Sequence, residues 1–221
     1  MTSSTVAPAT RGGSSKIGLI AGIGFVVLFV VSFMVFSTED GDAPDQKWID
    51  FWKDSDNRVE GWCASLTMLL AAMLFLWFVG ALRRRLANRV GTDAAYASGI
   101  VYAALLFIAG FAAGVVPIGY DLGDVVIPTN PDVIRLIDGL YYGVIFLAVP
   151  YAIAGFLIPL FFALRGSSVL PIWLGIFGLV VGVVALSGPV SFVIPHALFL
   201  IWVLITSIVL LMRDSGPSTV A

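Results

Sequence analysis

The chain has 221 residues, of which 59% are hydrophobic and 12% are charged, and its mean hydropathy is +1.01. A soluble domain is nearer half apolar and about a quarter charged, so this composition leaves too little polar surface to cover a water-soluble globule. The net charge of −2 gives no basic field that would attract nucleic acid, and the single cysteine, Cys63, excludes an intrachain disulfide. The composition therefore indicates an integral membrane protein.

Five stretches of the chain contain no Asp, Glu, Lys or Arg, and four of them have the length of one membrane span. A helix needs about 20 apolar residues to cross the hydrocarbon core of a bilayer. The fifth stretch, residues 166–212, is too long for one helix, and Gly188, Pro189 and Pro195 predict a turn inside it. We therefore expect an all-α, polytopic transmembrane helical bundle of six spans. The expected spans are residues 17–37, 61–82, 96–118, 139–164, 170–188 and 194–212.

The first span follows Arg11 and Lys16, as the core of a signal peptide would. Its apolar stretch is longer than 20 residues, however, against about 7–15 for a signal core, so we expect this span to be retained. The two ends of the chain, residues 1–16 and 213–221, are rich in small and polar residues that bury little surface. We expect both to be disordered cytoplasmic tails.

An amphipathic outer loop, residues 39–60, separates the first two spans. Trp48, Phe51, Trp52 and Val59 share one face if this loop is helical, and Asp45 is the expected helix N-cap. One arrangement is a short helix lying on the outer leaflet with its rings at headgroup depth. The alternative is that the aromatic face caps the outer end of the bundle. The expected interfacial anchors are Trp48, Phe51, Trp52 and Trp62.

Basic residues cluster directly after the second span and set the expected orientation. With the N-terminus inside, the cytoplasmic segments hold eight Lys and Arg residues and the outer segments hold four. The positive-inside rule then puts both termini of this multi-pass protein in the cytoplasm. The same cluster has the character of a binding site for anionic lipid headgroups. Its members are Arg83, Arg84, Arg85 and Arg89.

Four spans carry a pair of glycines four residues apart, a spacing that lets helix backbones approach closely in lipid. We expect close packing inside one bundle, and the alternative is a face for a homo-oligomer or a membrane-protein partner. Two prolines, Pro150 and Pro159, fall inside the fourth span and predict a kink there, which a transporter would use as a gate. The glycine pairs are Gly18/Gly22, Gly110/Gly114, Gly139/Gly143 and Gly178/Gly182.

Polar side chains gather near the outer ends of the expected spans. The span interiors have no charged residue, which argues against an ion-coupled transporter. One histidine with carboxylates has the chemistry of a divalent metal site or an acid–base pair, but no His-x-His, His-Glu-x-x-His or Asp-x-Asp spacing supports either. We therefore expect no metal, no cofactor and no catalytic residue. The outer polar residues are Glu60, Asp121, Asp124, Asp138, Tyr142 and His196.

Three stretches carry a resemblance to known proteins: "PDQKWIDFWKDSDNRVEGW" after the first span, "LFLWFVGALRRRLA" at the end of the second, and "LPIWLGIFGLVVGVVAL" before the last. In this order they resemble a family of uncharacterised multi-pass membrane proteins of actinobacteria. The family's acidic first loop ends in an Asn-Arg-Val-like element, here Asn57-Arg58-Val59. The resemblance covers about residues 17 to 213. It implies a bacterial plasma membrane and an even number of spans, and it implies no activity or catalytic residue.

Three functions remain open at the level of sequence. The first is a non-enzymatic scaffold or accessory subunit whose loop or bundle face engages another envelope protein. The second is a transporter or channel for a small or lipophilic molecule. The third is a membrane-embedded enzyme that uses the outer carboxylates and His196. The charge-free spans and the sizeable outer loop favour the first.

Overall fold

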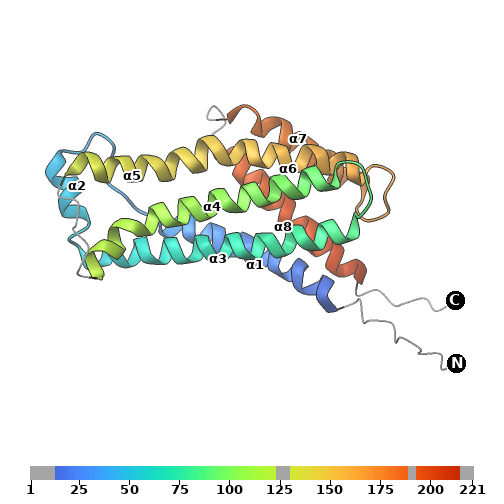
Figure 1. Ribbon diagram of the computed structural model, residues 1–221, viewed down its shortest axis with the longest axis horizontal. Helices are drawn as coiled ribbons and strands as arrows, with labels where there is room; N and C mark the ends of the chain where they lie inside the picture. Colours follow the sequence, from blue (N-terminus) through green and yellow to red (C-terminus); the bar gives the residue numbers. More distant parts are fainter. Residues whose placement is uncertain (1–12, 123–129, 189–192, 215–221) are drawn as a thin grey trace, which may run out of the picture.

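The computed structural model describes residues 13–122, 130–188 and 193–214, and every regular element in these ranges is a helix. Asp124, residues 1–12 of the expected first tail and residues 215–221 of the expected second tail (213–221) lie outside the described residues. The elements, drawn in Figure 1, are α1 (Gly13–Val35), α2 (Asp45–Phe51), α3 (Ser55–Arg85), α4 (Thr92–Asp121), α5 (Pro131–Gly143), the π-helical segment η1 (Val144–Ala148), α6 (Val149–Leu164), α7 (Ile172–Ala185) and α8 (Ile194–Asp214).

The expected all-α membrane protein is confirmed at this level. Among the described residues, five helices are long and apolar enough to cross a membrane: α1, α3, α4, the continuous α5–η1–α6 and α8. The helix α7 has 14 residues, or about 21 Å at 1.5 Å per residue, which is less than the ~30 Å of the hydrocarbon core. Several helices also begin or end beyond the expected spans: α1 starts at Gly13, α3 starts at Ser55 and α8 ends at Asp214.

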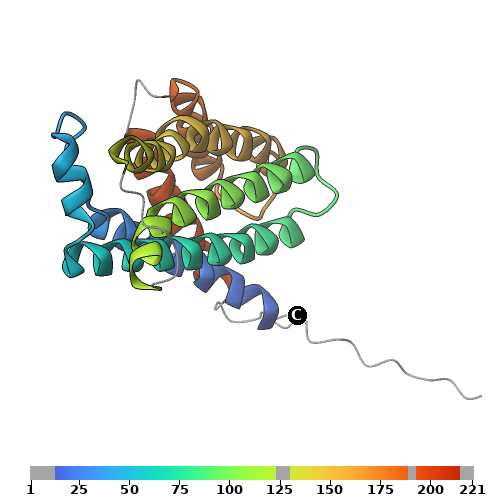
Figure 2. The ribbon, with the colours of Figure 1, turned by 60° about the vertical axis from the view of Figure 1, so that its left-hand side comes forward.

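The helices run as antiparallel neighbours along one axis (Figures 1 and 2). Helix α1 packs against α3 and α8, α3 against α4, α4 against α6, and α6 against α7. Figure 1 shows that α1 begins and α8 ends at the same end of the bundle, which we call the basic end, and that α2 covers the other, the cap end. An ion pair between Arg85 of α3 and Asp214 of α8 joins two helices at the basic end. The α7–α8 hairpin lies along the half of the bundle nearer this end.

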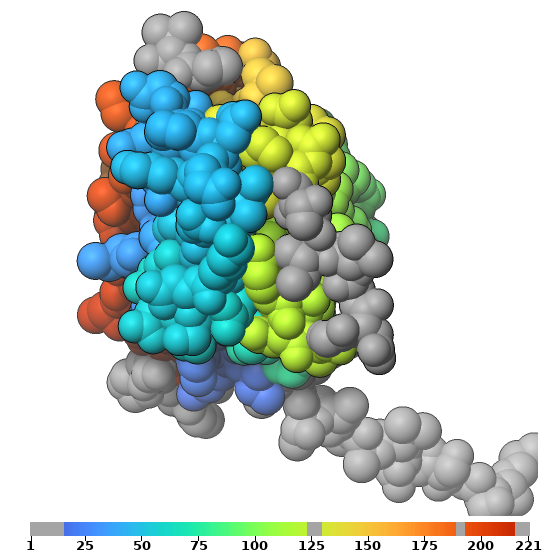
Figure 3. All heavy atoms as spheres, turned by 90° about the vertical axis from the view of Figure 1, so that its left-hand side faces the viewer, coloured from blue at the N-terminus to red at the C-terminus, as the bar shows by residue number. Residues whose placement is uncertain are grey.

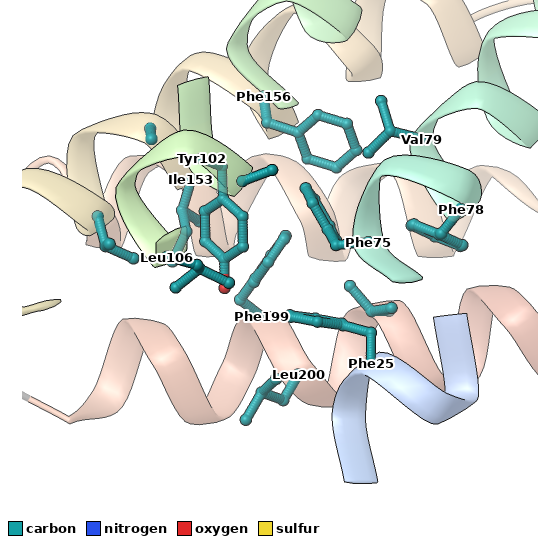
Figure 4. Close-up of a cluster of buried hydrophobic side chains, with 14 of the residues drawn as sticks. Phe25, Phe75, Phe78, Val79, Tyr102, Leu106, Ile153, Phe156, Phe199 and Leu200 are labelled. Carbon is teal, nitrogen blue, oxygen red and sulfur yellow. The ribbon is translucent and has the colours of Figure 1, made fainter. Parts of the chain in front are cut away.

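Aromatic rings from five helices meet at the centre of the bundle. Phe75 of α3 lies in the middle, with ring centroids 4.9 Å from Phe25 of α1 and 4.6 Å from Tyr102 of α4. Phe156 of α6 and Phe199 of α8 are each 5.8 Å from the Phe75 ring (Figure 4). Edge-on and tilted ring pairs at these distances add to the dispersion energy that holds helices together in lipid, where water supplies no driving force.

Three of the four glycine pairs are used inside the bundle. A Cβ on Gly18 would lie 2.5 Å from the Cβ of Ala81, and one on Gly22 would lie 2.6 Å from the Phe78 ring, so α1 touches α3 only because both positions lack a side chain. The pairs Gly110/Gly114 and Gly178/Gly182 are similarly crowded by neighbouring helices. The pair Gly139/Gly143 instead has no atom of another residue within 4 Å of a built Cβ.

This difference between glycines predicts the outcome of adding a single methyl group. We expect Gly22→Ala to lower the free energy of unfolding by about 1–3 kcal/mol, because the new Cβ overlaps the buried ring of Phe78. The matched change Gly139→Ala adds a methyl group to open space, and we expect it to be neutral or slightly stabilising. Thermal unfolding of the detergent-solubilised protein compares the two, and equal losses would contradict this account of α1 packing.

Candidate functional site

Residues 39–60 fold into a structured cap over one end of the bundle. Figure 2 shows α2 crossing the ends of α3 and α5 rather than following the bundle axis. The expected short helix in this loop is present, but its expected N-cap is wrong by one residue. Pro44 occupies the N-cap position with φ −57° and ψ 150°, and Asp45 is the first helical residue. Proline suits this position because it has no amide hydrogen that would need a partner.

The aromatic face of α2 packs onto the bundle. Trp48 is 3% exposed and Trp52 is 5% exposed, and both lie in a small second hydrophobic cluster with Ala43, Val116 of α4 and Ile134 of α5. These two rings therefore lie against protein and not among lipid headgroups, so the capping arrangement is the one adopted. Figure 3 views this cap end directly, with residues 39–60 lying across it beside the ends of α4 and α5.

The helix predicted to continue through Val59 is interrupted. Helix α2 ends at Phe51, where the Asn57 side-chain amide donates to the Phe51 carbonyl over 2.8 Å. A new helix, α3, begins at Ser55 with Asp54 as its N-cap, whose carboxylate accepts from the Asp56 amide. As a result Val59 belongs to α3 and is 59% exposed, so its expected place on the aromatic face is wrong.

Arg58 ties the break in the cap to the end of α4. Its Nε donates to Asp121 over 2.8 Å, and its Nη1 donates to the main-chain carbonyls of Trp52 and Lys53 over 3.1 and 2.7 Å. The other carboxylate oxygen of Asp121 accepts from Trp62 Nε1 over 2.8 Å. The Arg58 side chain is only 20% exposed, and hydrogen bonds to charged groups in such sites are the stronger kind.

A second arginine, Arg135 of α5, ties the beginning of α2 to the bundle. Its guanidinium donates to the Ala43 carbonyl over 2.9 Å and pairs with Asp45 at 2.8 Å. It also lies 5.6 Å from the ring centre of Trp48, within the range of a cation–π contact. The cap is therefore held at both ends of its short helix, by one arginine from α3 and one from α5.

The opposite side of the cap carries a concentration of acidic groups. The exposed acidic residues of the cap are Asp40, Asp42, Asp45, Asp50, Asp54, Asp56 and Glu60, of which Asp45 pairs with Arg135 of the bundle. The Lys53 ammonium, 2.6 Å from Asp50, lowers the pKa of that carboxyl and in turn has its own pKa raised, so both groups stay charged near neutral pH. Because this pair is neutral overall, the negative charge that the cap presents comes from its other exposed carboxylates, such as Asp40 and Asp42.

The outer polar residues that the sequence singled out have separate partners. Glu60 is exposed and accepts from the Ser37 hydroxyl, whereas Asp121 holds Arg58 and Trp62. Asp138 lines a cavity of about 10 Å³ beneath Trp52, and Tyr142 packs its ring against Phe146. In the described part of the chain, no three His, Cys, Asp or Glu side chains come together in a way that could hold a metal ion.

His196 is buried inside the bundle, where it hydrogen-bonds to the π-helical segment of the fourth span. Its Nε2 is 2.9 Å from the carbonyl oxygen of Ile145 in η1. The Val149 amide donates to the carbonyl of Val144, five residues earlier. If the same spacing continued, the amide of residue 150 would donate to the carbonyl of Ile145. Residue 150 is proline and has no amide hydrogen. His196 therefore donates to a carbonyl that Pro150 leaves without a helical partner, with the proton on Nε2.

The arginines of the basic end are partly engaged in local contacts. Arg83 pairs with Asp93 at 3.1 Å and lies 4.4 Å from the Tyr96 ring centre, while Arg85 pairs with Asp214. Arg213, expected in a disordered tail, is the next-to-last residue of α8 and donates to the carbonyls of Ser168 and Val169. Arg89 is exposed.

Reasoning from sequence did not identify the two arginines that hold the cap. Arg58 and Arg135 counted only as charges on the outer side, because their acceptors lie up to 92 residues away in the chain. A local signal does exist for Arg58, since Asn57-Arg58 follows directly after the helix break that both side chains stabilise.

Comparison with protein-family models, with curated proteins and with solved structures finds no match for this chain.

The arginine tie predicts that the cap can be released while the bundle stays folded. We expect Arg58→Ala to weaken the closed cap by about 1.5–3 kcal/mol, since three hydrogen bonds are lost and Asp121 loses its partner charge. Chymotrypsin cleavage after Trp48, Phe51 or Trp52 should then become at least about tenfold faster. The control Lys53→Ala removes an exposed pair and should change little. Equal protection in both variants would contradict the role of Arg58.

The contact between His196 and the π segment predicts a rescue. We expect His196→Leu to cost about 1–3 kcal/mol of stability, because the Ile145 carbonyl loses its donor inside the bundle. Pro150→Ala supplies an amide at the position that this carbonyl would use, so the double variant His196→Leu/Pro150→Ala should recover much of the loss. Unfolding measurements of the four proteins give the coupling energy, and simple additivity would count against the arrangement.

Proposed function

We propose that this protein is a non-enzymatic scaffold or accessory subunit whose acidic cap engages the basic surface of another envelope protein. The observation that carries the proposal is the combination of firm anchoring and outward charge in residues 39–60. Trp48 and Trp52 bury one side of the cap, Arg58 and Arg135 fix it, and its other side carries exposed carboxylates.

Anchoring of this kind favours binding. A loop that is already ordered loses little conformational freedom when a partner docks, so more of the contact energy appears as affinity. Fixed carboxylates also accelerate association with a basic surface and fix the register of the complex. A cap that served only to shield the bundle end would need the buried tryptophans but would not need charge concentrated on its far side.

We further infer that the chain crosses a bacterial plasma membrane six times with both termini in the cytoplasm. The beginning of α1 and the end of α8 share one end of the bundle (Figure 1), which supports an even number of crossings with α7 as one of them. Along α7 the exposed residues Ile172, Ile176, Val180 and Val183 form an apolar stripe that suits lipid contact. The resemblance to multi-pass actinobacterial proteins and the arginines at the basic end support the same orientation.

One experiment tests both the orientation and the partner. In a Cys63→Ser background, Asp42→Cys is reacted in intact cells with a membrane-impermeant maleimide that carries a photo-crosslinker. The control is Val90→Cys, which is exposed in the turn at the basic end. We expect Asp42→Cys to be labelled and, after irradiation, to give one discrete adduct, whereas Val90→Cys is labelled only after lysis.

Neutralising the cap gives the matched comparison. With the crosslinker attached at Lys47→Cys, an exposed position on α2, we expect the additional changes Asp40→Asn and Asp42→Asn to abolish the adduct without altering thermal stability. Labelling of Val90→Cys in intact cells would show that the orientation is the opposite of the one inferred above. Labelling of the cap without any charge-dependent adduct would refute the scaffold.

A further inference from the structure

Two cavities meet at the basic end of the bundle, on the face where α1, α3 and the α3–α4 turn come together. The first has a volume of about 410 Å³ and is lined by Ile17, Gly18, Leu76, Trp77, Gly80 and Arg84. The second has a volume of about 310 Å³ and is lined by Arg83, Arg84, Ala87, Asn88, Arg89, Thr92 and Asp93. Arg84 lines both cavities, so they adjoin at its side chain.

The first cavity is an apolar groove that opens toward lipid. Ile17 and Trp77 form its walls and are 53% and 57% exposed. Its floor is low because Gly80 has no side chain, and the nearest described side-chain atom to a Cβ built there is Nη1 of Arg84, at 3.7 Å. The guanidinium of Arg84 therefore lies at the end of the groove that adjoins the second cavity. Trp77 precedes Arg84 by seven residues on α3 and so lies about 10 Å nearer the centre of the bundle.

The second cavity is polar and carries net positive charge. Arg83, Arg84 and Arg89 contribute three guanidinium groups, and among the described residues that line this cavity the one carboxylate, Asp93, is paired with Arg83 at 3.1 Å. The neighbouring arginine, Arg85, turns away to pair with Asp214 of α8. Arginine binds phosphate oxygens through a planar fork of donors, and such charge-assisted hydrogen bonds are strong.

We propose that the two cavities together bind one anionic phospholipid. The phosphate and headgroup occupy the arginine cavity against Arg84 and Arg89, and an acyl chain follows the groove over Gly80 and along Trp77. A polar, positively charged cavity that continues into an apolar groove matches the two halves of such a lipid, and the charge of the site disfavours a zwitterionic one. This site lies at the opposite end of the protein from the cap and is independent of the partner proposed there.

Lipid retention by the purified full-length protein tests the site. The protein is titrated with phosphatidylglycerol or phosphatidylcholine in detergent micelles, and bound lipid is counted by native mass spectrometry. We expect preferential binding of one phosphatidylglycerol, weakened about tenfold by Arg84→Ala. The control Arg165→Ala removes the same charge at the same end but lines neither cavity, and we expect wild-type binding.

A second variant separates a shaped site from general attraction to a basic surface. Gly80→Leu keeps every charge but fills the groove, so we expect it to reduce phosphatidylglycerol binding as well. If this variant fails to fold, Trp77→Ala, which removes a wall of the groove, provides the same comparison. Equal weakening by Arg84→Ala and Arg165→Ala would overturn the proposal, as would unchanged binding when the groove is altered. Competition by soluble glycerol phosphate as strong as by the lipid would assign the site to a free phosphate instead.

Discussion

The helices α3 and α4 and the continuous α5–η1–α6 are much longer than the hydrocarbon core of a bilayer is thick, and much of the architecture follows from that excess. Helices α3 and α4 have 31 and 30 residues, about 46 and 45 Å, against ~30 Å of hydrocarbon. Beyond the lipid, apolar side chains such as Val116 and Ile134 would face water. The loop between α1 and α3 covers them with Trp48 and Trp52, so the protruding part of the bundle has a small hydrophobic core of its own.

Arginine side chains join parts of this molecule that are distant in sequence. At the cap end, Arg58 reaches from α3 to α4, and Arg135 reaches from α5 back to the loop before α2. At the basic end, Arg213 supports the turn that leads into α7. A guanidinium carries several donors in a fixed plane, which lets one residue satisfy a carboxylate and main-chain carbonyls together. These arginines therefore fix loops at both ends of the bundle by their geometry.

The membrane-spanning helices were predictable because hydropathy is a property of the local sequence. The charge-free stretches located α1, α3, α4, α6 and α8 to within a few residues at most ends. What could not be predicted depends on contacts made across the bundle. The break between Phe51 and Ser55, which removed Val59 from the aromatic face, requires Arg58 and its acceptor on α4. The π-helical register of η1 likewise depends on a histidine that follows it by about fifty residues. The sequence grouped the outer polar residues by their place near helix ends, but only the fold could assign separate partners to those that the structure describes.

The bond between His196 and Ile145 has a consequence during synthesis, because its acceptor is made before its donor. Helices α5 and α6 are synthesised with one carbonyl that their own backbone does not satisfy, and the donor for it lies on α8, which follows them in the chain. Until α8 arrives, the nascent chain carries an exposed polar defect at membrane depth, of the kind that keeps a chain in contact with insertion machinery. Packing of α8 therefore does more than add a helix to the bundle, because it removes a polar defect from helices that precede it in the chain.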